Sequence, residues 1–100
     1  MNKTAIIVPV FNEAENLPIL FENIEKIERP EFIFIFVNDG SQDKSFEILK
    51  TANFNHLLIN HKKNLGLASA VKSGIDEAKK LDVDYVVKVD ADLQHNLEEI

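Results

Sequence analysis

The chain has 100 residues, 45% of them hydrophobic and 28% charged, which allows one small domain with a single core. Its formal net charge of −6 argues against a general nucleic-acid-binding protein, which needs a basic face to displace counterions from phosphates. It contains no cysteine, which excludes a disulfide framework or a thiolate zinc site, and no apolar run reaches the roughly 18 residues of a membrane span, so we expect a soluble, cytoplasmic domain.

The first half of the chain predicts a strand, a helix and a second strand. The apolar run at 4–11 is too short for a helix and indicates a buried strand, with Pro9 near its end because proline cannot donate to a ladder. Asn16 is suited to cap the following helix, in which apolar residues recur at helical spacing from Leu17 to Ile27. A second buried strand is expected over 31–40, ending in Asn-Asp-Gly.

The second half continues the alternation of helices and strands. We expect a short helix from Ser41 or Asp43 to Ala52, a strand at 56–60, a helix at about 67–81 and a strand at 83–89. Strands alternating with amphipathic helices predict βαβ units with right-handed crossovers. The expected fold is therefore α/β, a Rossmann-like three-layer α/β/α domain with four parallel strands in the order 3-2-1-4 and helices on both faces.

Three of the four predicted strands end in polar clusters, which read FNEAEN, NDGSQD and DADLQH. Any one cluster is explained well as turn chemistry, because Asp and Asn are ordinary turn residues. Parallel strands bring their carboxyl ends to one rim, where open α/β sheets bind ligands, so three clusters together favour a site. A rim that holds Glu13, Asp39, Asp90 and Asp92 would repel itself unless cations or hydrogen-bond donors were supplied.

Asp90 and Asp92 alternate at the end of the fourth predicted strand. Both carboxylates can reach one Mg²⁺ or Mn²⁺ ion, or one can bind the metal while the other meets a sugar hydroxyl. Alone, this Asp-x-Asp pattern is a weak signal in an acidic protein. Lys88 either extends to solvent or pairs with a neighbouring acid.

The remaining polar residues give weaker signals. Asp39 belongs either to a turn or to a site that accepts hydrogen bonds from a base or ribose, where Gly40 would allow close approach. Gly66 precedes a predicted helix, but no G-x-G-x-x-G motif is present, which disfavours a dinucleotide-binding oxidoreductase. His56 and His61 belong to no recognisable constellation.

Four ordered segments together resemble a known family. They read IIVPVFNEAENL, FVNDGSQDKS, NLGLASAVKSGIDEA and VVKVDADLQH, and they resemble the nucleotide-binding half of the family 2 inverting glycosyltransferases, which have the GT-A fold. The resemblance covers nearly the whole chain. The segment DADLQH favours the polyprenyl-phosphate branch, which is similar to dolichol-phosphate mannose synthase and its bacterial relatives.

The resemblance implies a nucleotide-binding role for residues of three segments. Pro9, Asn12 and Glu13 match the family's PxxNE element, whose glutamate lies against the nucleoside. Asp39 matches an aspartate that contacts the base, and the loop around Gly66 is expected near the nucleotide.

The fourth segment is implied to serve the metal and the sugar phosphate. Asp92 and Asp90 match the family's metal-binding and sugar-nucleotide DxD motif, with Asp90 also close to the nucleotide. Gln94 matches a glutamine near the donor or acceptor phosphate. The sequence departs from the family at Phe11, where tyrosine is common, and at Asn96, where proline is frequent.

The implied activity is transfer of a sugar, with inversion, from a UDP- or GDP-linked donor to an acceptor such as a polyprenyl phosphate, with Mg²⁺ or Mn²⁺ as cofactor. In this family the base lies C-terminal to DxD, so no catalytic residue is assigned here. Asn96 would cap a helix that barely begins, so residues 1–100 are interpreted as the nucleotide-sugar-binding half of a GT-A domain, truncated after DxD and without turnover.

That interpretation carries two further expectations and leaves two alternatives. Apolar surface exposed by truncation would favour self-association, and the parent enzyme could associate with a membrane through regions outside these residues. One alternative is a stand-alone α/β module that binds nucleotide or metal, or serves only as a folding unit. The other is a receiver-like phosphoacceptor domain, which is disfavoured because it needs paired acids after the first strand.

Overall fold

Strands and helices alternate along the part of the chain that the structure, a computed structural model, describes, which is residues 3–91. The elements are β1 (Thr4–Val10), α1 (Leu17–Ile27), β2 (Phe32–Asp39), α2 (Ser45–Leu49), β3 (His56–His61), α3 (Leu67–Lys79) and β4 (Tyr85–Lys88). All strand pairs are parallel, and the order in the sheet is β3-β2-β1-β4, which confirms the predicted topology.

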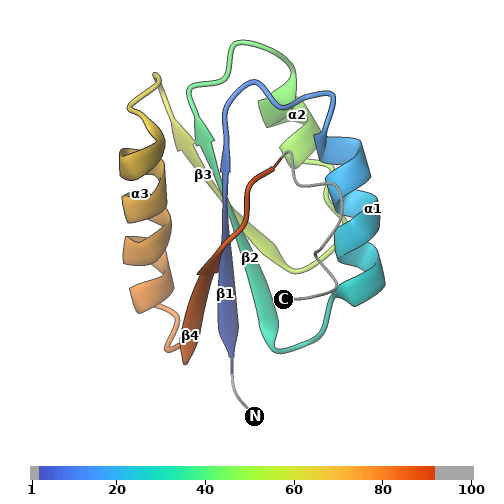
Figure 1. Ribbon diagram of the computed structural model, residues 1–100, viewed down its shortest axis with the longest axis vertical. Coiled ribbons are helices and arrows are strands. Elements are labelled where there is room, and N and C mark those ends of the chain that lie inside the picture. The colour runs from blue at the N-terminus through green and yellow to red at the C-terminus, as the bar shows by residue number, and fades with distance from the viewer. Residues whose placement is uncertain (1–2, 92–100) are drawn as a thin grey trace.

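Successive side chains of the central strands point to opposite faces of the sheet, which explains the three layers seen in Figure 1. On β1, Ile6 and Val8 point to the face covered by α1 and α2, whereas Ala5 and Ile7 point to α3. Both faces are apolar because both carry helices, which is why these strands read as continuous hydrophobic runs.

Aromatic side chains fill the face below α1 and α2. Phe34 and Phe36 on β2 meet Phe54 and Phe21 edge to face, with ring centroids 5.4 Å apart for Phe34–Phe54 and 5.8 Å for Phe21–Phe36. Such pairs contribute about 0.5–1.5 kcal/mol each beyond the area they bury. The opposite face uses small residues on α3, which brings that helix close to β1 and fixes its position beside the strand ends.

Several predicted element boundaries were too generous, including the end of α2, which was predicted at Ala52 and lies at Leu49. The starts of α2 and β4 each have a local cause. α2 begins only at Ser45, because the Asp43 carboxylate accepts N–H groups of both Ser45 and Ala14 and holds the preceding turn against another loop. β4 begins only at Tyr85, after Asp82 adopts a left-handed φ of 54°. Asn16 does precede α1, but its side chain donates to Glu13 Oε1 and makes no cap bond to the helix.

The edge strand β4 exposes two apolar side chains. Tyr85 and Val86 are 57% and 46% exposed, and among the described residues β4 pairs only with β1. Exposed apolar edges are templates for pairing with another chain. We expect light scattering at rising concentration to show association that weakens in Val86→Lys; a wild-type chain that stays monodisperse at high concentration would contradict this.

In the described part of the chain, no helix combines the length and apolar character that crossing a bilayer requires.

Candidate functional site

The carboxyl ends of β1, β2 and β4 meet around one pocket of about 440 Å³. Five of the residues proposed from the sequence line it, together with apolar and small neighbours. The lining residues are Pro9, Val10, Phe11, Glu13, Asp39, Asn64, Gly66, Leu67, Ala70, Asp90 and Ala91. The parallel topology therefore does bring the three acidic clusters to one rim.

Asn12 is the predicted nucleotide-binding residue that does not line this pocket. It has a positive φ of 53°, its N–H donates to Ser41 Oγ, and its Oδ1 accepts the Gln42 N–H at 2.8 Å. Glu13 is held similarly, because its N–H donates to Ser45 Oγ. These contacts tie the loop after β1 to the loop after β2.

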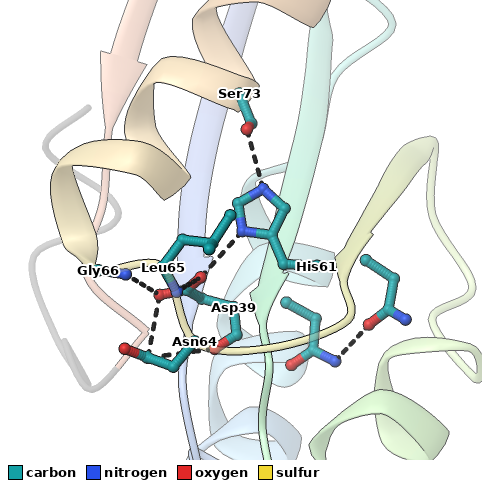
Figure 2. A network of polar contacts seen from close by, with 8 residues as sticks. Asp39, His61, Asn64, Leu65, Gly66 and Ser73 are labelled. Atoms are coloured by element: carbon teal, nitrogen blue, oxygen red, sulfur yellow. Dashed lines mark hydrogen bonds and ion pairs between the residues drawn. The ribbon is translucent and has the colours of Figure 1, made fainter.

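Asp39 is the buried centre of the site, only 3% exposed. Oδ1 accepts the Leu65 N–H and a hydrogen bond from His61 Nδ1, both at 2.9 Å (Figure 2). Oδ2 accepts the Gly66 N–H at 2.9 Å and Asn64 Nδ2 at 3.1 Å. An ionised carboxylate has about four lone-pair positions, so the chain itself occupies all of them. A ligand that hydrogen-bonds to Asp39 has to replace one of these donors or share an oxygen with it.

The same contacts determine the ionisation of Asp39. Burial alone raises the pKa of a carboxyl, but the hydrogen bonds from His61 and from the Leu65 and Gly66 N–H groups outweigh it. The pKa of Asp39 is therefore held below its usual value, and the side chain is an acceptor at neutral pH.

Two glycines shape the loop between β3 and α3. Gly40 has a φ of +70°, and a Cβ there would lie 2.3 Å from the backbone N of Asn64 and from the carbonyl carbon of Lys63. Gly66 has a φ of +100° and donates its N–H to Asp39. Both backbone conformations favour glycine, which answers why NDG and NLG occur at these positions.

Asp90 is the one predicted metal ligand within the described residues. Its Oδ1 lies 2.9 Å from Lys88 Nζ, so Lys88 pairs with an acid, and both side chains are largely exposed. Asp92, Gln94 and Asn96 lie outside the described residues, and no group of three metal-ligating side chains occurs within residues 3–91. The described residues that line the pocket include three carboxylates and no lysine, arginine or histidine.

His61, Ser73 and Asn64 are residues of this site that the sequence patterns missed. His61 was expected to belong to no constellation, but it pairs with Asp39 and its Nε2 lies 2.9 Å from Ser73 Oγ. In the β2–β3 register, Asp39 stands directly beside His61. That register is the signal that would have found the contact, since both residues end their strands.

Comparison with known proteins adds a family and a set of relatives. The family model described as Glycosyl transferase family 2 matches residues 5–100. The chain is 39% identical over 108 residues to an undecaprenyl-phosphate 4-deoxy-4-formamido-L-arabinose transferase of Proteus mirabilis, covering 100% of this chain and 32% of that protein. A prophage bactoprenol glucosyl transferase homolog of Escherichia coli is 32% identical over 98% of the chain and 33% of its own length. The chain thus spans about a third of these relatives.

Solved structures share the fold. The mannosyltransferase PcManGT from Pyrobaculum calidifontis, in complex with GDP-Man and Mn²⁺, superposes with a TM-score of 0.79 at 23% identity, over 90% of this chain and 27% of that one. TarS of S. aureus in complex with UDP-GlcNAc gives 0.80 at 25% identity, over 97% of this chain and 29% of that one. These glycosyltransferases have the GT-A fold, and the four-stranded sheet matches part of it.

Proposed function

The chain belongs to glycosyl transferase family 2, and we propose that it is the nucleotide-sugar-binding part of an enzyme that transfers a sugar to a polyprenyl phosphate. The acceptor class is suggested by relatives whose names specify undecaprenyl phosphate or bactoprenol. In the proposed reaction an acceptor phosphate oxygen attacks the anomeric carbon while the bond to the nucleoside diphosphate breaks, so configuration inverts. The chain alone is proposed to bind the donor without turnover. An acceptor phosphate is already anionic, so its attack needs no base to deprotonate it.

The pocket at the strand ends is the observation that carries this proposal. It brings Pro9, Glu13, Asp39, Gly66 and Asp90, from separate segments, around one cavity. A nucleoside presents flat apolar faces and polar edges. The exposed ring of Phe11 and the exposed methyl groups of Leu67 suit such a face. The carboxylates of the pocket and the amide of Asn64 suit the polar edges. Asn12 is proposed to support the glutamate beside it.

The charge of the pocket supports a divalent cation. A diphosphate entering among Glu13, Asp39 and Asp90 would be repelled, since the described lining residues supply no cationic side chain. We propose that Asp92 and Asp90 hold Mn²⁺ or Mg²⁺, for which carboxylate oxygens are suitable ligands, and that Gln94 lies near a phosphate. Such an ion supplies neutralisation of the charge on the departing diphosphate.

Calorimetric titration of UDP and GDP, each with and without Mn²⁺ or Mg²⁺, tests this function. We expect saturable, metal-dependent binding to the wild type. Asp90→Asn and Asp92→Asn should each weaken it by at least about tenfold. Loss of a group that only hydrogen-bonds to a metal ligand already costs roughly that much in metal affinity. Asp76→Asn is the matched control, because Asp76 is an exposed aspartate on α3 that pairs with Lys72.

Each result of this titration discriminates between functions. No binding at millimolar nucleotide would favour the purely structural module. Binding that is unchanged when the metal is withheld would overturn the proposed cation site while leaving the nucleotide site. A preference for UDP or GDP would identify the donor class.

A further inference from the structure

A chain of polar contacts runs from α3 into the buried centre of the pocket. Ser73 Oγ lies 2.9 Å from His61 Nε2, and His61 Nδ1 lies 2.9 Å from Asp39 Oδ1 (Figure 2). The His61 and Asp39 side chains are 11% and 4% exposed. Ser73 and His61 do not line the pocket. Any effect they have on a ligand there is therefore exerted through Asp39.

The direction of each hydrogen bond follows from the chemistry of the partners. An ionised carboxylate can only accept, so His61 Nδ1 must carry a hydrogen. Nε2 of a neutral His61 is then an acceptor, and the Ser73 hydroxyl donates to it. In the imidazolium form Nε2 donates and the same hydroxyl accepts. The serine suits both states, so the contact survives a change in the charge of His61.

The positions of His61 and Ser73 in the fold indicate what their contacts hold in place. The loop at 62–66 leaves β3 at His61 and enters α3, on which Ser73 lies. The His61–Ser73 bond therefore joins the two elements that flank the loop. Asp39 binds the Asn64 amide and the Leu65 and Gly66 N–H groups in the middle of that loop. Loss of the His61–Asp39 bond would remove one of the four donors on the carboxylate around which the loop is built, and loss of the His61–Ser73 bond would free the imidazole to turn away from it.

We propose that His61 and Ser73 are positioning residues that hold Asp39, and through it the 64–66 loop, in the geometry that binds the nucleotide. Asn64 and Gly66 are the members of that loop that line the pocket. The link to ligand binding rests on the proposed function, whereas the link to the loop does not.

A nucleophilic role for Ser73 does not fit, although Ser-His-Asp contacts in this order also occur in hydrolases. Ser73 lies within α3 and outside the pocket lining, so its Oγ is not presented to a substrate there. A triad also needs donors aimed at an oxyanion beside the nucleophile. The pair therefore fits support of Asp39 and not bond cleavage.

Three variants separate the two bonds, and Ser73→Thr and Thr51→Ala serve as controls. His61→Ala removes both. Ser73→Ala removes only the outer one. His61→Asn retains a donor, because the asparagine Nδ2 stands near the position of imidazole Nδ1, but cannot reach Ser73. Thr51→Ala is the matched control, because it removes a 2.7 Å side-chain hydrogen bond to Ile48 O elsewhere in the fold.

We expect two quantities to change together: the rate of amide hydrogen exchange at Leu65 and Gly66, and the dissociation constant for UDP or GDP. His61→Ala should raise both more than tenfold, the effect of one hydrogen bond to a charged group, and Ser73→Ala roughly threefold to tenfold. His61→Asn should resemble Ser73→Ala. Ser73→Thr keeps the hydroxyl and should give wild-type values, and Thr51→Ala should leave both quantities unchanged.

Nitrogen NMR of the wild type adds a readout that needs no ligand. The neutral form of His61 should be the Nδ1–H tautomer, opposite to the preference of free histidine. An Nε2–H tautomer, or wild-type exchange at Leu65 and Gly66 in His61→Ala, would overturn the proposal. If the wild type binds neither nucleotide, the proposed function fails, while the exchange and tautomer data still decide whether the pair holds the loop.

Discussion

Gly40→Ala is expected to lower the free energy of unfolding by about 4 kcal/mol and to abolish nucleotide binding. The added Cβ would lie 2.3 Å from Asn64 N and from the Lys63 carbonyl carbon, and these are backbone atoms that a rotamer change cannot move away. The φ of +70° adds strain for any residue with a Cβ. Strain and overpacking each cost roughly 1–3 kcal/mol, so the loop at 62–66 has to move away from Asp39.

Gly66→Ala separates these two causes and is the matched control. Its φ of +100° also disfavours alanine, but nothing lies within 4 Å of the added Cβ. The free energy of unfolding should then fall only by the cost of the backbone strain, roughly 1–3 kcal/mol. Urea unfolding of both variants gives the comparison. Equal losses would show that the close approach of Gly40 to the loop does not contribute.

The arrangement of strands and helices could be predicted because each element carries its own signal. Both faces of β1 and β2 are buried, so their sequences are continuous apolar runs, and the helices repeat apolar residues at helical spacing. The order β3-β2-β1-β4 follows from short right-handed crossovers between parallel strands. Boundaries were less predictable, because the start of α2 depends on a hydrogen bond between Asp43 and a distant loop.

The candidate site was predictable to the extent that its residues end strands. Glu13, Asp39 and Asp90 line one pocket because parallel strands share an edge. Side-chain partners depend on register and on the path of loops, which spacing alone does not determine. His61 therefore gave no signal, although it is the residue beside Asp39 in the sheet. Asn12 matched a binding motif, but its backbone turns its side chain toward Gln42.

Asp39→Asn is the second substitution with a large expected effect, a loss of about 3 kcal/mol at neutral pH. Four donors converge on the Asp39 carboxylate, and two of them are backbone N–H groups that cannot rotate away. An asparagine offers one oxygen to them and turns an NH₂ group toward the others. Breaking a buried charged pair typically costs roughly 3–5 kcal/mol, and the remaining oxygen recovers part of that. Nucleotide affinity should fall as well, because Asn64 and Gly66 lose their common anchor.

The dependence of this loss on pH identifies its cause. Because the pKa of Asp39 is lower in the folded chain than in the unfolded one, its ionised form stabilises the fold above the usual pKa of about 3.9. That contribution disappears as the pH falls through the folded pKa. The difference in unfolding free energy between wild type and Asp39→Asn should therefore shrink on acidification from about pH 5 to below about pH 3. The pKa of Asp43 is lowered too, but Asp43 is present in both proteins and cancels in the difference. A difference that stays constant over this range would mean that packing, and not the charge of Asp39, holds the loop.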